Sequence, residues 1–211
     1  MAAYPKKFAS IFPAAALRAC GWSPLPIFLC LVSGCSTAAC RFEIVDHRAG
    51  DGDRRYTETF DEAYYDLDGR GNVDIVLRRR QASEAEPADS ITQVIHIRSV
   101  WRPIPGQTVA GKTQINGCVS YIIVGGRSGA TFEGAGSVFF SENEAKGTLT
   151  GTLDQASLRP VRRLAGGSSL FERAELSGAF QAHRDKRNTA RIINEMNRLF
   201  GPLPTYRPDG P

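Results

Sequence analysis

Short β-forming segments separated by turn residues run from position 56 to position 183, and they limit the fold more than any other feature of the chain. In residues 72–79, NVDIVLRR, apolar and polar side chains alternate over most of the run, which is the period of a half-buried strand. No helical period appears before Asp185. This order predicts a mainly β fold, an antiparallel β-sandwich or barrel, rather than alternating strands and helices.

The strand with this pattern follows an aromatic-rich segment and a glycine-rich turn, so residues 56–65 and 72–79 are predicted to pair as a β-hairpin. The most apolar part of this region, residues 115–124, is predicted to be a central strand. The other predicted strands occupy residues 91–101, 131–140, 146–153 and 169–183.

Residues 186–200, KRNTARIINEMNRLF, have the only helical pattern in this part of the chain. The apolar residues recur with the spacing of one helical face, and they are Ile192, Ile193, Met196, Leu199 and Phe200. Gly201 and Pro202 end the pattern. We expect this C-terminal α-helix to pack on a sheet face or to close a barrel end. Its basic residues leave contact with a membrane surface as an alternative. Residues 202–211 are predicted to be an extended, proline-rich tail.

The first 34 residues have the pattern of a secretory signal peptide. They contain three basic residues, Lys6, Lys7 and Arg18, and no acidic residue. The apolar run 25–32 is much shorter than the roughly 20 residues that a membrane-spanning helix needs. Residues 1–34 are therefore predicted to be removed from the mature chain.

This leader ends in Val32, Ser33, Gly34 and Cys35, a sequence that resembles the lipobox of bacterial lipoproteins. The resemblance implies that Cys35 is the lipidated N-terminus of the mature chain and that the membrane is a partner through this anchor. It also implies a location in the bacterial cell envelope, in the outer membrane where there are two membranes. Cleavage by an ordinary signal peptidase, which would give a secreted protein, is the alternative.

The resemblance at the leader, together with the strand, helix and proline patterns after it, divides the chain into four parts. Residues 1–34 form the signal peptide, and residues 35–54 form the lipidated N-terminus and a tether, within which residues 42–46 could form one strand. Residues 55–201 form the β domain with its C-terminal helix, and residues 202–211 form the tail. The mature domain, unlike the leader, has no recognisable family motif.

The net charge argues against nucleic acid as a partner. The whole chain carries +4, but without the three basic residues of the leader 23 basic residues face 22 acidic ones. A nucleic-acid-binding domain generally needs a basic face and a high isoelectric point.

Five cysteines are present, and two of them, Cys40 and Cys118, remain after the leader and the lipidation site are set aside. In an oxidising compartment they could form a disulfide, which would close a long loop and stabilise the fold. Neither belongs to a C-x-x-C pair, so a zinc or redox site is not indicated.

The acidic turn DLDGRGNVD, residues 66–74, is the only candidate metal site. Asp66, Asp68, Asn72 and Asp74 offer oxygen ligands at spacings similar to those of calcium loops in extracellular proteins. Arg70 stands where such loops place a further carboxylate, so an ordinary hairpin turn is the competing interpretation. No other cofactor is indicated.

The sequence therefore favours a non-enzymatic envelope lipoprotein with a binding or structural role, whose partner would be an envelope protein or a ligand. One alternative is an exported hydrolase with a cleft lined by His96, Asp66, Asp68 and Asp74. Another is a carrier of a small apolar ligand, which requires a barrel with an internal cavity.

Overall fold

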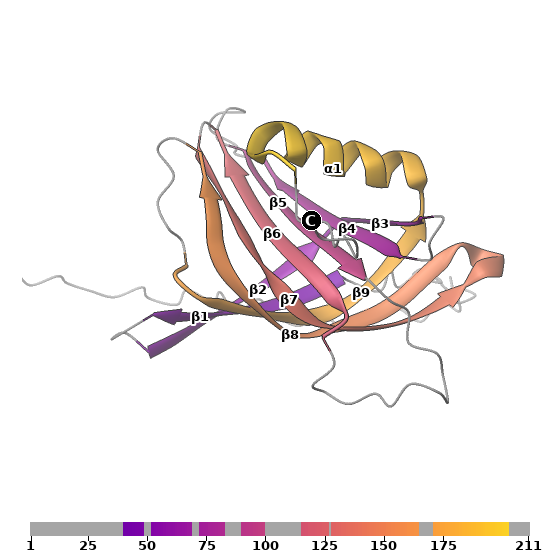
Figure 1. The fold of residues 1–211 in the computed structure, drawn as a ribbon, viewed down its shortest axis with the longest axis horizontal. Coiled ribbons are helices and arrows are strands. Elements are labelled where there is room, and N and C mark those ends of the chain that lie inside the picture. The colour runs from indigo at the N-terminus through magenta and orange to yellow at the C-terminus, as the bar shows by residue number, and fades with distance from the viewer. Residues whose placement is uncertain are drawn as a thin grey trace, which may run out of the picture. The chain divides into compact units, whose positions relative to one another are not determined.

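The computed structural model describes residues 40–48, 52–68, 72–82, 90–99, 115–126, 128–164 and 171–202. Nine strands form one sheet that curls into a near-ring, and one helix follows them at the C-terminal end (Figure 1). The pairing is antiparallel except for one short contact. The predicted mainly β class with one C-terminal helix is confirmed. The predicted signal peptide, Cys35 and nearly all of the proline-rich tail lie outside the described residues.

The strands differ greatly in length, from six residues to sixteen. In chain order they are β1 (Cys40–Arg48), β2 (Gly52–Phe60), β3 (Glu62–Leu67), β4 (Val73–Gln81), β5 (Ile91–Ser99), β6 (Gly117–Gly125), β7 (Ser128–Asn143), β8 (Thr148–Arg163) and β9 (Ala174–Arg184). The 3-10 turn Glu144–Lys146 joins the two longest strands.

Strand β9 closes the near-ring. The strands follow the order β2-β1-β9-β3-β4-β5-β6-β7-β8, and β9 also pairs with β8 along its other edge. The edge of β9 that faces away from β8 pairs with two strands. Strand β1 pairs with one part of this edge in antiparallel orientation, and β3 pairs with another part in parallel, at Tyr64 and Tyr65. Because β9 lies beside strands from both ends of the sheet, the closure joins parts of the chain more than 100 residues apart.

Strand β1 already begins at Cys40, so the predicted tether, residues 35–54, includes residues that belong to the β domain. Residues Cys40–Arg48 form β1, which pairs with β2 along its full length and with β9 over six residues. Phe42 and Ile44 are fully buried in the core. Burial of these two alternating side chains is what makes this segment a strand of the sheet rather than a linker.

The predicted hairpin is present but smaller than expected. Strands β3 and β4 pair antiparallel, with Tyr65 opposite Ile75. The segment 56–65 is divided at Asp61, and its first half belongs to β2, which pairs with β1 instead. The aromatic-rich segment therefore contributes to two strand pairs.

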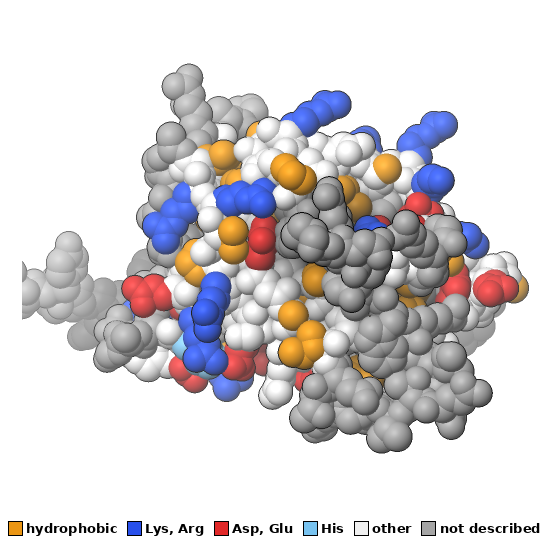
Figure 2. Space-filling view, in the orientation of Figure 1, with side chains coloured by type: hydrophobic (Ala, Val, Ile, Leu, Met, Phe, Trp, Pro, Cys, Tyr) orange, Lys and Arg blue, Asp and Glu red, His pale blue; other side chains and the backbone are white. Residues whose placement is uncertain are grey.

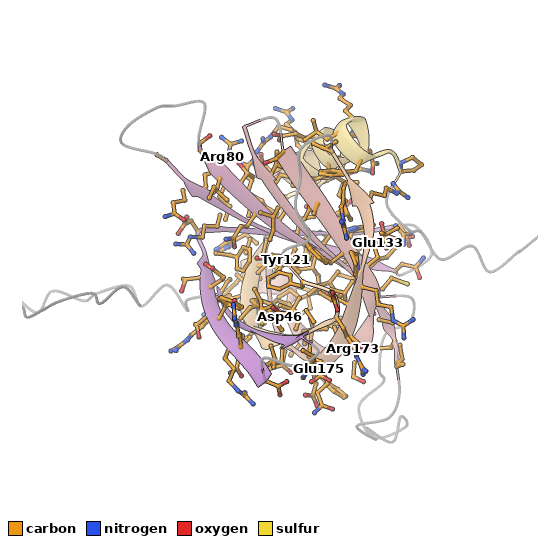
Figure 3. All side chains as sticks on the ribbon, turned by 90° about the vertical axis from the view of Figure 1, so that its left-hand side faces the viewer. Asp46, Arg80, Tyr121, Glu133, Arg173 and Glu175 are labelled. Carbon is orange, nitrogen blue, oxygen red and sulfur yellow. The ribbon has the colours of Figure 1, made fainter. Side chains whose placement is uncertain are left out.

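The core fills the centre of the near-ring. Its largest fully buried side chains include Tyr65, Tyr121 and Phe132, and Figure 3 shows Tyr121 among side chains that converge from the surrounding strands. Phe171 contacts both Tyr121 and Phe132, with ring centroids 6.5 Å and 5.2 Å away. Such packing gives no support to the alternative of a carrier with an apolar internal cavity.

Helix α1 (Lys186–Phe200) has the predicted bounds and packs on the outer face of the sheet, beside β3 and β4 (Figure 1). Ile192, Met196 and Phe200 form a second apolar cluster with sheet residues such as Val76 and Ile122. Leu199, expected on the apolar face, is exposed instead. Basic side chains project to solvent over the helix (Figure 2). In the residues described, no helix has the length and apolar character needed to cross a bilayer.

Candidate functional site

A pocket of about 220 Å³ lies between helix α1 and the outer face of the sheet. The sheet contributes charged residues and the helix contributes mainly small or amide side chains. The lining residues are Asp66, Asp74, His96, Arg98, Thr189, Ala190, Ile193, Asn194 and Asn197. We call this the helix–sheet pocket.

The register of three neighbouring strands places the charged residues together. Asp66 of β3 lies opposite Asp74 of β4, and Asp74 lies opposite Arg98 of β5. His96 is two residues from Arg98 on the same strand and therefore shares its face. Because Ile75 and Ile97, which alternate with these residues, point into the core, the charged row points outward under the helix.

A histidine and an arginine hold Asp74 from two sides. His96 donates from Nε2 to Oδ1 of Asp74 over 2.9 Å, and Arg98 donates from Nη1 to Oδ2 over 2.8 Å. The His96 and Asp74 side chains are only 4% and 15% exposed. Since Nε2 carries the proton in this bond, a neutral His96 ring presents Nδ1 as an acceptor. Nδ1 has no hydrogen-bond partner in the described part of the chain.

Arg98 also fixes the turn that follows β3. Its Nη2 lies 3.0 Å from Oδ2 of Asp68. Asp68 in turn accepts hydrogen bonds from the backbone and the side-chain amide of Asn72, over 2.9 Å and 2.7 Å. The predicted calcium ligands Asp66, Asp68, Asn72 and Asp74 are therefore close in space, but a guanidinium occupies oxygens of two of them. Among the described residues, no group of three or more acidic, histidine or cysteine side chains is arranged to hold a metal ion.

The carboxylate of Asp66 lacks such a partner. It has no hydrogen bond or ion pair with any residue in the described ranges, although it lines the pocket directly opposite Asp74. Like charges that face each other across an antiparallel pair destabilise a sheet. Arg98 pairs with Asp74 and Asp68 and leaves the charge of Asp66 uncompensated.

The helix side of the pocket is positioned by the N-cap of α1. Asp185 accepts hydrogen bonds from the backbone and side chain of Asn188, and these bonds lower the pKa of the Asp185 carboxyl. Thr189 donates from Oγ1 to the carbonyl oxygen of Asp185 over 2.7 Å. From this start, residues one helical turn apart place Ala190, Ile193, Asn194 and Asn197 along the pocket.

A buried cation fixes the helix to the sheet next to the pocket. Arg78 of β4, whose side chain is only 4% exposed, donates from Nε to Oε1 of Glu62 over 3.0 Å and makes a second bond to the same carboxylate through Nη2. Its Nη1 lies 3.5 Å from Oε2 of Glu195 in α1. Arg78 therefore connects β3, β4 and the helix.

Beyond His96 the polar row continues across β6 and β7. Ser120 lies opposite His96, and Glu133 of β7 lies opposite Ser120. Burial raises the pKa of the Glu133 carboxyl, and the nearby Arg162 opposes this shift. Cys118, opposite Arg98, also has a raised pKa because it is partly buried, so it is mainly a neutral thiol at neutral pH.

The predicted Cys40–Cys118 disulfide is not formed, and both thiols are free. Cys40 is buried in the core on β1, where its sulfur lies 3.5 Å from the carbonyl oxygen of Gln181. Cys118 lies on β6, on the outer face of the sheet. These strands are not neighbours in the sheet, so the two cysteines cannot reach each other without rearranging it.

The sequence had placed His96, Asp66, Asp68 and Asp74 together only as a possible hydrolase cleft, and the strand register does bring them together. Arg98 and the residues of α1 were missed. Arg98 could have been predicted, because a residue two positions after His96 on a strand lies on the same face. The residues of α1 could not, since nothing in the sequence tells which part of the sheet the helix covers.

Comparisons of this chain with protein-family models, with curated proteins and with solved structures gave no match.

Proposed function

We propose that this chain is a lipoprotein of the cell envelope, held to the membrane through Cys35, whose helix–sheet pocket binds a small polar ligand. The observation that carries the binding part is the pocket itself. It combines a volume of about 220 Å³ with four titratable side chains from three adjacent strands. A concave site with a few convergent polar groups is the usual form of a small-molecule site. The anchor rests on the lipobox-like residues before Cys35.

A ligand screen with a blocked pocket tests the binding role. Ala190 is an exposed helix residue that lines the pocket, so Ala190→Phe introduces a ring there without disturbing the core. Leu199→Phe is the matched control, because Leu199 is exposed on the same helix and does not line the pocket. Saturation-transfer NMR with a fragment library of cationic, neutral and anionic members would be recorded for all three proteins.

We expect some fragments to bind the wild type and Leu199→Phe and to lose binding to Ala190→Phe. If the two variants give the same fragment profile as the wild type, the binding role of the pocket is wrong. The anchor is tested separately, by the mass of the N-terminal peptide from the membrane fraction. Acyl mass on Cys35 that is absent from Cys35→Ala supports it, and an unmodified N-terminus elsewhere contradicts it.

Hydrolysis is the second candidate, and the His96–Asp74 hydrogen bond favours it. A carboxylate that orients a histidine is a common arrangement for a general base. In the described residues, however, no serine hydroxyl or thiol is hydrogen-bonded to His96, and Cys118 is mainly a neutral thiol. Ester cleavage that is lost in His96→Gln would support hydrolysis, and equal rates for the two proteins would exclude this role for His96.

A further inference from the structure

We propose that the helix–sheet pocket selects a protonated amine, an ammonium group that carries N–H donors. This inference rests on the proposed binding function and names its ligand class. The pocket is lined by one guanidinium and two carboxylates, and a third carboxylate lies beside it, so carboxylates outnumber the guanidinium. Among the described residues, Asp66 and Nδ1 of His96 are acceptors in this lining without a partner.

The two facing carboxylates of the pocket favour a ligand with positive charge. Asp66 and Asp74 lie directly opposite each other on β3 and β4. Arg98 compensates Asp74 and Asp68, but no cation in the described residues reaches Asp66. A ligand with positive charge at this point would remove a repulsion that the empty pocket retains.

The buried histidine of the pocket favours a ligand that donates a hydrogen bond. The His96 ring is 4% exposed and lines the pocket, with Nε2 donating to Asp74. Nδ1 has no hydrogen-bond partner among the described residues, and it is not one of their buried unpartnered atoms, so it is open to the pocket. In the tautomer that carries its proton on Nε2, Nδ1 accepts a hydrogen bond, so a ligand N–H directed at it would find an acceptor. Asp66 and Nδ1 together require a donor with positive charge, which an ammonium group supplies.

The same pattern excludes close alternatives. A quaternary ammonium has the charge but no N–H, so it cannot donate to Nδ1 or to the carboxylate. A neutral polyol has donors but no charge, and a carboxylate ligand would meet two acidic groups. The source of the amine is either a free small molecule or the ethanolamine headgroup of a lipid, since both present the same chemistry.

The probe is ethanolamine, with choline and ethylene glycol as its quaternary and neutral counterparts. Binding to the full chain would be followed by NMR chemical-shift titration. We expect ethanolamine to bind at least about tenfold more tightly than either counterpart, since one charge-assisted hydrogen bond is sufficient for that ratio. Equal affinity for ethanolamine and ethylene glycol would overturn the proposal.

Asp66→Asn removes the charge and keeps the shape, and we expect it to weaken ethanolamine binding by about tenfold or more. Asp61→Asn is the control, because Asp61 is an exposed aspartate just before β3 that does not line the pocket. It should leave the affinity unchanged. An Asp66→Asn variant that binds ethanolamine as tightly as the Asp61→Asn control would overturn the proposal.

Vesicles distinguish the two sources of the amine. Phosphatidylcholine vesicles with and without phosphatidylethanolamine would be added during the ethanolamine titration. Competition only by the ethanolamine-containing vesicles identifies a lipid headgroup, and no competition identifies a free amine. Should ethanolamine fail to bind while other fragments still depend on Ala190, the ligand class is wrong and the binding function stands. If ethanolamine does not bind and no fragment depends on Ala190, the proposed binding function is wrong as well.

Discussion

Replacing Arg78 by methionine measures how much one buried cation stabilises the contact between α1 and the sheet. The Arg78 side chain is 4% exposed and makes two bonds to Glu62, which is 30% exposed, and one longer contact to Glu195, which is 43% exposed. Methionine keeps much of the side-chain volume and removes the charge. Glu62 then loses this cation, whereas Glu195 keeps Arg191 at 4.0 Å, and both carboxylates remain able to bind water.

The expected loss in the free energy of unfolding follows from the exposed fractions of these three side chains. Removing one partner of a fully buried ion pair costs about 3–5 kcal/mol, and the partial exposure of Glu62 lowers the expected loss for Arg78→Met to about 2–3 kcal/mol. Glu62→Gln should cost about as much, roughly 2–3 kcal/mol, because it leaves the buried Arg78 cation without its main counter-charge although one hydrogen bond can survive. Glu195→Gln should cost no more than about 0.5 kcal/mol, as expected for an exposed pair.

Urea unfolding followed by circular dichroism gives these free energies, and a double-mutant cycle of Arg78→Met with Glu62→Gln gives the coupling directly. The reasoning is refuted if Arg78→Met costs less than about 1 kcal/mol, since the pair would then contribute no more than a surface one. It is also refuted if Glu195→Gln costs as much as Glu62→Gln, because the geometry assigns the main interaction to Glu62.

Three further predictions concern the close approach of β7 and β8, the β1–β2 hairpin and the helix. A Cβ on Gly134 would overlap the backbone carbonyl oxygen of Ser157 in β8, so Gly134→Ala should cost at least about 2 kcal/mol in urea unfolding, whereas Gly125→Ala, with ordinary contacts, should be nearly neutral. A hydrogen bond to Asp53 raises the pKa of His47 above 6.5. The protonated ring therefore stabilises the fold, and this stabilisation, which His47→Gln removes, should be complete below pH 6.5 and should vanish as the pH rises through the raised pKa. A difference in unfolding free energy between the two proteins that stays the same across that range contradicts this. Ile192→Ala should cost about 2–4 kcal/mol and speed amide exchange throughout α1, because Ile192 is fully buried between helix and sheet.

Local patterns predicted the elements that local chemistry determines. The spacing of Ile192 and Met196 and the stop at Gly201 gave the bounds of α1, because one amphipathic period and one terminal signal are sufficient for a helix. The alternation in residues 73–77 gave β4 in the same way. The segment 40–48 was assigned mostly to a tether because it follows a predicted anchor, although Phe42 and Ile44 alternate as in a strand.

The closure of the near-ring and the pocket depended on contacts that no local pattern contains. Strand β9 pairs with β1, β3 and β8, and the first two of these precede it by more than 100 residues. The length of β8 was underestimated because the strand continues beyond a register shift after Leu153, where alternation fails. Asp74 was a candidate because of the acidic turn and His96 because it lies on a predicted strand, whereas strand register, which brings them together, and the residues of α1 were not predicted.

If Asp66 serves binding at a cost to stability, one set of unfolding measurements shows it directly. The free energy of unfolding of the wild type and of Asp66→Asn would be measured with and without ethanolamine at about ten times its dissociation constant. Without ligand, we expect Asp66→Asn to be more stable than the wild type by about 0.2–1 kcal/mol, because the repulsion with Asp74 is removed. Ethanolamine should stabilise the wild type by about 1.4 kcal/mol and the variant, at the same concentration, by no more than about 0.4 kcal/mol. A ligand-free variant that is less stable than the wild type, with ethanolamine stabilising both proteins equally, would contradict the account.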